Sequence, residues 1–407
     1  MESARINQNM DSTPQIMKRH YFDWAATAAP DPAAFFTENY PAIENIPFGN
    51  PSSRHSEGRT AKQALENARK RCAAILGVEP QTLYFTSGGT ESNCIPLFSC
   101  LARQGSGRLL ASLGEHASVS ENLNILERLG KRVGRIPIDS KGKVSEAILA
   151  QTLEKYPDTC FAAIIGVNNE VGSINNLTAL RDVLSRKNGA PIHLHCDMVQ
   201  ATGKIPIDIA GWGIDSASFS AHKIGGPRGI GLLYLRRPLE ILCSGGGQEN
   251  KIRPGTENVA GALAFASCLE KHASADNLAM EMAKARTRCV KLLSGLKGIE
   301  RCQIIPMERG IDDEGFSPYI VQAAFKGIPG EVMARALDDH GFAVSTGSAC
   351  SSALTQHSQE QQRPILFAMG IEKSLSLEGI RISQGWSTTD EDIEQLLQAI
   401  SEVLQLL

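Results

Sequence analysis

The chain has 407 residues, of which 42% are hydrophobic and 21% are charged, and its formal net charge is −3 at pH 7. This composition is ordinary for a soluble globular protein of two or three domains. The small net charge shows no excess of basic residues of the kind that binds nucleic acid. No apolar stretch approaches the roughly 20 residues that span a bilayer. We therefore expect neither a nucleic-acid partner nor a membrane partner.

The first 20 residues are polar and of mixed charge. They lack the apolar core of a signal peptide, so we expect a disordered leader over residues 1–20 and a cytoplasmic protein. Ten cysteines are scattered along the chain without a C-x-x-C pair. This spacing argues against structural zinc and, without a secretory signal, against a disulfide framework, so no metal site is expected.

From residue 21 to about residue 237 the chain alternates helix and strand patterns. One apolar helix face covers 61–76 and should end at Gly77. The predicted strands are 83–86, 161–165, 191–196, 215–220 and 231–235. Strands that alternate with helices favour a mostly parallel sheet covered on both faces, so the predicted fold class is α/β. We assign this large domain to residues 21–260.

The last third of the chain has a different pattern. A long, alanine-rich and charged helix over about 257–300 is expected to connect two domains. Strand, helix and strand signals then follow at 319–325, 331–340 and 342–345. A final helix opens with a capping-box pattern at 388–391. These features predict a smaller C-terminal α/β domain over residues 261–407.

Three strand ends carry groups that could act together. The run 87–90, Ser-Gly-Gly-Thr, follows a strand and opens a helix, so its backbone N–H groups could converge on an anion. Asp197 ends another strand, where a partly buried carboxylate needs a cationic partner. Lys223 follows a third strand, and lysine is the side chain that forms Schiff bases. Taken singly, the motifs also fit a plain turn, a helix N-cap and a solvated surface charge.

The three groups together are much more specific than any one of them. Pyridoxal phosphate requires a phosphate site, a partner for its pyridinium nitrogen and an amine for its aldehyde. In open α/β sheets, ligands bind beyond the carboxyl ends of the strands, which is where these motifs lie. The sequence therefore predicts a pyridoxal 5'-phosphate site.

With these motifs identified, the chain resembles the class V aminotransferase family of pyridoxal-phosphate enzymes, and specifically the cysteine desulfurases of the NifS/IscS type, group I. The matching segments are YFDWAAT at 21–27, GNPSSR at 49–54, SGGTESN at 87–93, EH at 115–116, VNNEVG at 167–172, CDMVQATGKIPID at 196–208, SAHK at 220–223, RPGTEN at 253–258, STGSACSS at 345–352 and IRISQG at 380–385. The resemblance implies the PLP-dependent transferase fold type I and the conversion of L-cysteine to L-alanine.

The resemblance also implies roles for the matching site residues. Lys223 would hold the cofactor covalently, Asp197 would pair with its pyridinium nitrogen, and Gln200 would hydrogen-bond its ring oxygen. His116 would stack on the ring and move protons. Because such enzymes are homodimers with shared active sites, one phosphate contact would come from the second subunit. The phosphate-binding residues would be Gly89, Thr90, Ser220, His222 and Thr256 of the partner subunit.

The resemblance implies a substrate site as well. Asn169 and Arg381 would grip the carboxylate of L-cysteine, Arg381 with both arms of its guanidinium, although Asn169 and Thr256 could also be simple turn residues. Cys350 lies among small polar residues rather than apolar ones, which favours a reactive, mobile thiol. It would take the sulfur as a persulfide and pass it to a sulfur-acceptor protein, a scaffold or a sulfur carrier, for iron–sulfur cluster or thio-cofactor synthesis.

Some positions depart from the family pattern. Residues 28–29 are Ala-Ala where threonine or proline is usual, Ser351 stands where threonine is common, and the segment after Cys350 is longer than in relatives. These differences leave the chemistry intact and the sulfur acceptor open. The alternatives are a selenocysteine lyase, another class V aminotransferase-type enzyme, and a non-catalytic member that serves as a binding partner. Cys350 favours a desulfurase over an aminotransferase without excluding selenium chemistry, and the intact Lys223 and Asp197 argue against a non-catalytic protein.

Overall fold

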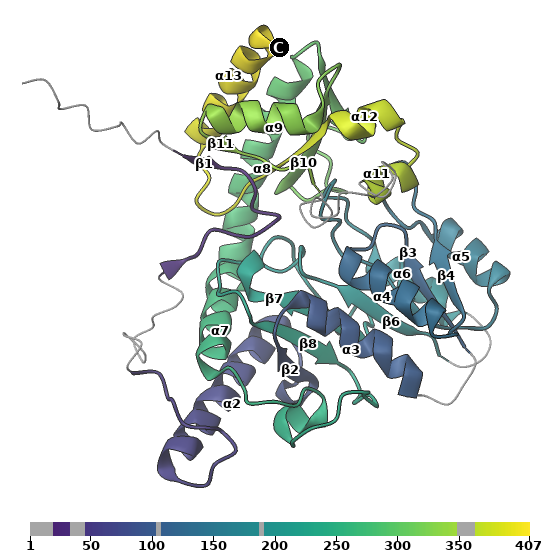
Figure 1. Cartoon of the computed structure of the whole chain (residues 1–407), viewed down its shortest axis with the longest axis vertical. Helices are drawn as coiled ribbons and strands as arrows, with labels where there is room; N and C mark the ends of the chain where they lie inside the picture. The colour runs from purple at the N-terminus through teal and green to yellow at the C-terminus, as the bar shows by residue number, and fades with distance from the viewer. Residues whose placement is uncertain (1–18, 33–44, 103–106, 187–190, 348–362) are drawn as a thin grey trace, which may run out of the picture.

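The computed structural model describes residues 19–32, 45–102, 107–186, 191–347 and 363–407 (Figure 1). Cys350 and most of the predicted leader lie outside these residues. Figure 1 shows a larger part around β2, β6, β7 and β8 below a smaller part around β10 and α13, with α8 running from one to the other.

Among the described residues, seven strands form the larger sheet, in the order β2-β8-β7-β6-β5-β3-β4. The strands are β2 (Leu83–Thr86), β3 (Arg108–Ser112), β4 (Val133–Ile136), β5 (Thr159–Ala163), β6 (His193–Asp197), β7 (Ser216–Ser220) and β8 (Gly231–Leu235). β8 runs antiparallel to both β2 and β7, whereas the pairs from β7 to β4 are all parallel. The prediction of a mostly parallel α/β sheet is confirmed, and each predicted strand ends within two residues of the observed one.

Helices cover both faces of this sheet. They are α2 (Ser56–Leu76), α3 (Gly89–Ala102), α4 (Ala117–Arg128), α5 (Glu146–Lys155), α6 (Leu177–Ser185) and α7 (Val259–Ala273). Alternate residues of a strand face opposite sides: Leu109 packs with α3 and α4, whereas Leu110 packs in the core that includes α2, α5, α6 and α7. Because both faces are covered, the strands are apolar almost throughout. α2 ends at Gly77, whose φ of 63° is left-handed, as the sequence predicted.

The smaller part has its own core around a second sheet, ordered β12-β10-β9 and antiparallel. Its elements are α8 (Ala275–Lys297), β9 (Cys302–Ile305), β10 (Ile320–Phe325), α9 (Gly330–Asp339), α11 (Pro364–Ala368), α12 (Lys373–Glu378), β12 (Gly379–Ser383) and α13 (Asp390–Leu406). A short parallel pair joins β1 (His20–Tyr21) to β11 (Phe342–Ala343). Phe22 packs in this second core, and Ile365 of α11 packs in the first. The predicted domain boundaries at 20 and 260 stay predictions.

Two helix predictions need correction. The single helix expected over 257–300 is two helices, because Ser274 is extended, with φ of −62° and ψ of 145°. The break lets α7 pack on α2 in the first core while α8 packs in the second. The capping box of α13 pairs Thr389 with Asp392, one residue later than predicted, because the Thr388 hydroxyl accepts the N–H of Gly385 instead.

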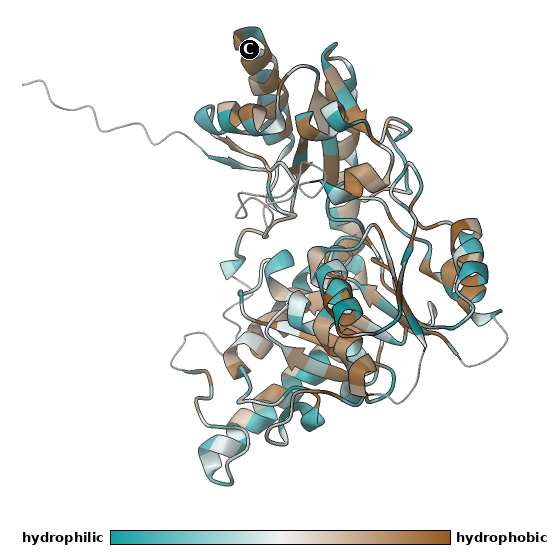
Figure 2. Cartoon of the chain, turned by 45° about the vertical axis from the view of Figure 1, so that its right-hand side comes forward, coloured by the Kyte–Doolittle hydropathy of each residue, from teal (hydrophilic) through white to brown (hydrophobic). Residues whose placement is uncertain are grey.

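The surface helices have one apolar and one polar face. Along α13, Ile393, Leu396 and Ile400 are buried while the residues between them are largely polar, and Figure 2 shows both colours on this helix. Within the described part of the chain, no helix combines the length and the apolar character needed to cross a membrane.

Candidate active site

The candidate site lies at the carboxyl ends of β6 and β7, next to the N-terminus of α3. β6 ends at Asp197 and β7 ends at Ser220, and the two strands are paired side by side with Asp197 opposite Ser218. A short 3-10 turn, Ala221–Lys223, follows β7 directly. The fold therefore brings the predicted carboxylate and the predicted lysine to one edge of the sheet, as expected for ligands of open α/β sheets.

Asp197 is held in one orientation by buried hydrogen bonds. Its side chain is 3% exposed. One carboxylate oxygen, Oδ2, accepts from Nδ2 of Asn93 at 2.7 Å, and Oδ1 accepts from the backbone N–H of Val199 at 3.0 Å. The bond from Val199 closes a tight local turn. Asp197 is therefore not a helix N-cap, the structural role that its sequence position also allowed. A carboxylate fixed in this way can face a cationic nitrogen without reorganising.

The partners of Asn93 extend this network. Oδ1 of Asn93 accepts from Nε2 of His195 at 2.9 Å and from the hydroxyl of Ser218 at 2.5 Å. Burial lowers the pKa of His195 to about 3, so its ring is neutral, and its Nδ1 accepts from Ser216 at 2.8 Å. Sequence reasoning missed Asn93 and His195. The available signal was that His195 and Asp197 share one strand face.

A space suited to a phosphate lies beside the start of α3. A Cβ atom built on Gly89 would stand 2.7 Å from Val199 Cγ2 and 3.7 Å from Ser220 Cβ, so only glycine leaves this space open. The buried hydroxyl of Ser220 has no hydrogen-bond partner among the described residues. Backbone N–H groups at a helix start favour an anion. Glycine, hydroxyl and helix start together fit the phosphate group of pyridoxal phosphate.

His222 and Thr90 are the other phosphate-binding residues predicted on this subunit. His222 is half-buried, and its Nδ1 lies 3.1 Å from the hydroxyl of Thr27. Burial lowers the pKa of His222 to about 4, helped by the charges of Lys223, Arg228 and Lys204, so its ring is neutral at pH 7. Thr90, in the first turn of α3, is exposed. His222 can therefore act towards an anion as a hydrogen-bond donor but not as a positive charge.

The Lys223 amine is held by the N-terminal segment. Its Nζ donates to the carbonyl oxygens of Ala25 at 2.6 Å and Ala26 at 2.7 Å. Gln200, which is 3% exposed, donates to the same Ala25 oxygen at 2.8 Å. The segment 21–27, about 200 residues away in sequence, therefore forms one wall of the site. The sequence motif alone did not indicate that its carbonyl groups would contact the lysine.

His116 lies among the charged groups of the site. It caps α4, and its Nδ1 accepts the backbone N–H of Ser118 at 3.1 Å. Burial lowers its pKa; the charge of Asp197 opposes this shift, while Lys223 and Arg381 add to it. Since Nδ1 is an acceptor, the neutral ring carries its proton on Nε2. A neutral imidazole can stack on an aromatic ring and exchange a proton.

Arg381 enters the site from β12 of the smaller part. It is 2% exposed, and its Nη1 donates to the carbonyl oxygens of Asn169 at 2.9 Å and Gly347 at 3.2 Å. Nη2 binds Oδ1 of Asp23 at 2.8 Å, which sequence reasoning missed. Within the described chain, neither Nε of Arg381 nor the amide oxygen of Asn169 has a hydrogen-bond partner. The structure thus brings the two predicted substrate-binding residues together and leaves polar atoms on both for a ligand.

Two predicted residues are not part of this described cluster. Thr256 is exposed, and no hydrogen bond to it is found in the described part of this subunit. Cys350 lies outside the described residues. The roles of Cys350 as the nucleophile and of Thr256 as a contact between subunits therefore stay predictions from the sequence.

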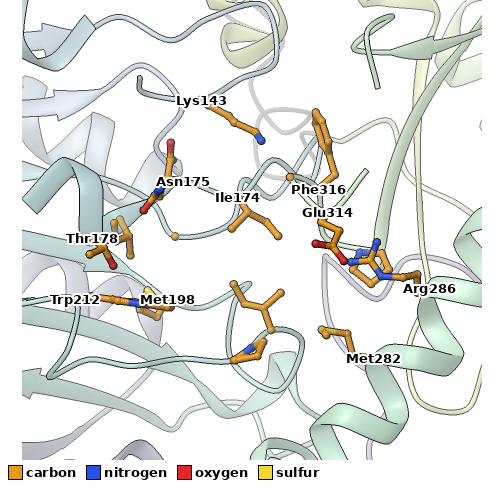
Figure 3. A pocket seen from close by; sticks show the side chains of 17 residues that line it. Lys143, Ile174, Asn175, Thr178, Met198, Trp212, Met282, Arg286, Glu314 and Phe316 are labelled. Carbon is orange, nitrogen blue, oxygen red and sulfur yellow. The ribbon is translucent and has the colours of Figure 1, made fainter. Parts of the chain in front are cut away.

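A separate cavity of about 510 Å³ lies between the two parts of the molecule (Figure 3). Ile174, Met198 and Trp212 line it from the larger part, and Met282 and Arg286 of α8 line it from the other side. Among its described lining residues there is none of the predicted site residues. The cavity is therefore distinct from the cluster around Lys223.

An α/β fold with a lysine, a fixed carboxylate and an anion space at neighbouring strand ends defines a pyridoxal-phosphate enzyme of fold type I. The sequence pattern described as aminotransferase class-V matches residues 20–396, and the chain belongs to this family.

Individual relatives and solved structures show which named proteins the chain is similar to. A NifS/IcsS protein homolog from Lactobacillus delbrueckii subsp. bulgaricus is 36% identical over 95% of this chain and 97% of its own. The cysteine desulfurase IscS of Dictyoglomus turgidum is 34% identical over 96% of each chain. A solved NifS-like protein matches with a TM-score of 0.84 and 32% identity over 96% of this chain and 100% of its own. The structure of SspA in complex with cysteine matches with a TM-score of 0.73 and 26% identity, over 89% and 98%.

Proposed function

We propose that this chain is a pyridoxal-phosphate-dependent cysteine desulfurase, which converts L-cysteine to L-alanine and transfers the sulfur to Cys350. The observation that carries this proposal is that the paired strands β6 and β7 bring Asp197 and Lys223 to one sheet edge, where the segment 21–27 binds both Lys223 and Arg381. The names of the relatives favour this function over the selenocysteine lyase alternative.

Each residue has a task that follows from its surroundings. When bound, the cofactor supplies an electron sink that makes the Cα proton of cysteine acidic. Asp197, already oriented by Asn93, would hold the protonated ring nitrogen. The Lys223 amine would take the Cα proton, and Nε2 of His116 would hold or return a proton. Arg381 and Asn169 would bind the substrate carboxylate and so orient the Cβ–S bond.

The sulfur step needs a thiolate. The Cys350 thiolate attacks the substrate sulfur, so that an S–S bond forms as the Cβ–S bond breaks. The electron pair of the broken bond stays with the carbon fragment, which takes up a proton and leaves as alanine. The products are alanine and one persulfide, which balances one cysteine and one thiol.

The finer parts of the proposal concern assembly and use. We propose a cytoplasmic homodimer in which Thr256 of the partner subunit completes the phosphate site; its exposure on this subunit supports such a contact. The persulfide would then supply a sulfur-acceptor protein in iron–sulfur cluster or thio-cofactor synthesis. Sedimentation of the purified protein and sulfur-transfer assays with candidate acceptors test these two points.

The replacement Cys350→Ser tests the function directly. Serine retains the shape but cannot form a persulfide, so alanine release from L-cysteine should fall to background while substrate still changes the absorbance of the bound cofactor. Alkylation and mass spectrometry should detect a persulfide at residue 350 in the wild type only. The matched control is Cys243→Ser, since Cys243 is an exposed cysteine elsewhere. Persistent cysteine turnover in Cys350→Ser would rule out this nucleophile.

A further inference from the structure

Lys204 is a buried cation to which the proposed mechanism gives no task. It is 7% exposed, and its Nζ donates to Oε1 of Gln200 at 2.6 Å. No ion pair found among the described residues includes it. A buried ammonium without a carboxylate is costly, so its presence calls for a physical reason. Burial lowers its pKa to about 7, and the positive charges of Lys223 and Arg381 add to this effect.

The chain turns Lys204 towards the site at Gly203. Gly203 has a φ of 67°, a left-handed conformation that favours glycine, and a Cβ there would stand 3.0 Å from Ile224 Cγ2. The backbone N–H of Lys204 donates to the carbonyl of Ala201 at 3.0 Å, which closes the turn. The turn packs beside the residue that follows Lys223, and this places both lysines near Gln200.

The Lys204 ammonium and the Ala25 carbonyl together decide which way the Gln200 amide points. In its protonated form Lys204 only donates hydrogen bonds, so it selects the amide oxygen, and the NH₂ end then faces the opposite way. One N–H of that end donates to the Ala25 carbonyl at 2.8 Å, the same oxygen that accepts from Lys223 at 2.6 Å. No second hydrogen bond from this amide nitrogen is found within the described residues.

We propose that Lys204 is a positioning residue that holds the amide oxygen of Gln200 and so makes Gln200 present an N–H donor to the ring oxygen of the cofactor. This inference rests on the proposed function and on the role that the family resemblance implies for Gln200, a hydrogen bond to that oxygen. Without Lys204 only the Ala25 carbonyl still favours this orientation, so the amide turns over more easily and presents its carbonyl, and two facing acceptor oxygens repel each other. Lys204 acts through Gln200 and does not itself touch the reacting atoms.

The test compares Lys204→Met with the wild type, both reconstituted with pyridoxal phosphate. Methionine has a similar volume but neither donor nor charge. We expect the dissociation constant of the cofactor to rise about tenfold, the size of one lost hydrogen bond to a charged group. The pH midpoint of the cofactor absorbance should also shift, because the hydrogen bond to the ring oxygen changes. The replacement Lys204→Arg keeps a donor and a positive charge. It should bring the dissociation constant of the cofactor to within about threefold of the wild-type value and should restore the pH midpoint.

Two comparisons separate positioning from general packing. Lys143→Met removes another lysine whose burial lowers its pKa, but one that lines the separate cavity, and it should leave affinity and absorbance unchanged. In a Gln200→Ala background, Lys204→Met should add less than about twofold, since residues acting through one contact are not additive. Fully additive effects, or a wild-type spectrum in Lys204→Met, would overturn the proposal.

A second variant keeps the test decisive if Lys204→Met does not fold. Gln200→Glu retains an acceptor for Lys204 but has no N–H to offer, so it should show the same absorbance shift with Lys204 in place. An unshifted spectrum in Gln200→Glu contradicts the proposal. If the wild type itself binds no cofactor at Lys223, the proposed function fails; if it does and the variants match it, the role of Lys204 alone fails.

Discussion

Asp197 and Arg381 are both almost fully buried charges, but their surroundings differ. We call Asp197, Asn93, His195, Gln200 and Lys223 the Asp197 side; both carboxylate oxygens there are hydrogen-bonded, and Asn93 and His195 are bonded in turn. The Arg381 side consists of Arg381, Asn169, Glu170 and Arg363. Four buried polar atoms on this side have no hydrogen-bond partner within the described chain: Arg381 Nε, Asn169 Oδ1, Glu170 Oε2 and Arg363 Nη1.

The difference indicates how each side works. Unpartnered buried polar atoms are costly and rare in folded proteins. A cluster of them beside a guanidinium fits a site that is completed when substrate binds, whereas the satisfied Asp197 network is complete before any ligand arrives. The Asp197 side is thus preorganised for a permanent cofactor, and the Arg381 side for a ligand that enters and leaves.

The strongest test of the Asp197 side is Lys223→Ala. Lys204, the other buried amine described near the site, is bonded to Gln200 and does not follow a strand end as Lys223 does, so desulfurase activity should fall by at least about a thousandfold. After borohydride reduction, mass spectrometry should detect the cofactor on residue 223 in the wild type only. An exposed lysine on α8 provides the control, Lys284→Ala, which should retain full activity. Activity above a few per cent in Lys223→Ala would contradict the assignment.

A smaller but still large loss is expected for Asp197→Ala. The cofactor should still bind covalently, but without the carboxylate its ring nitrogen is protonated less readily, so kcat should fall roughly a hundredfold. Steady-state kinetics and the absorbance of the bound cofactor measure the two effects separately. A near-wild-type rate would make Asp197 a structural residue and remove the contrast between the two sides.

The Arg381 side should respond in KM. Arg381→Lys keeps the charge but loses the planar fork, so we expect KM for L-cysteine to rise about tenfold or more, with a smaller change in kcat. Cofactor affinity should not change, because Arg381 belongs to the substrate side. If KM stays constant while cofactor affinity drops, the two sides are not separate in function.

Glu115 lies next to the Asp197 side but, unlike Asp197, has a carboxylate oxygen without a partner among the described residues. Its replacement should change the stability of the protein and have the least effect on the rate. Glu115 is 5% exposed, and its Oε2 lacks a partner within the described residues. Burial raises its pKa from 4.5 to about 8, with a contribution from Asp197. The folded protein therefore binds a proton that the unfolded chain releases between these values, so this contribution to stability is lost as pH rises from about 4.5 through 8.

Glu115→Gln should remove that pH dependence. Matched to the wild type at pH 5, the variant should become more stable than it by up to roughly 4 kcal/mol at pH 8, since each unit of pKa shift corresponds to about 1.4 kcal/mol. Thermal melts at the two pH values measure the difference. Parallel stability curves from pH 5 to pH 8 would show that Glu115 is ionised throughout.

The comparison also explains what could be predicted from the sequence. Lys223, Asp197, Gly89 and Ser220 lie at strand ends within short motifs, and the structure places them at one sheet edge. Asp23 and the Ala25 carbonyl lie about 200 to 360 residues from the groups that they bind. No local pattern connects such distant positions, so their contacts could not be predicted. The capping box was placed one residue early because adjacent residues fit the same local pattern, and the break at Ser274 was missed because the helical pattern continues across it.

The sequence by itself determined the alternation of strands and helices, the mostly parallel sheet and the chemical types of the site residues. These follow from hydrophobic periodicity and from motifs a few residues long, which are local properties. Only the tertiary structure decided that Asn93 and His195 orient Asp197, that Asp23 binds Arg381, and that Lys204 fixes the amide of Gln200. Buried polar groups must find partners wherever the fold brings them, and these partners are set by packing between distant segments rather than by neighbouring residues.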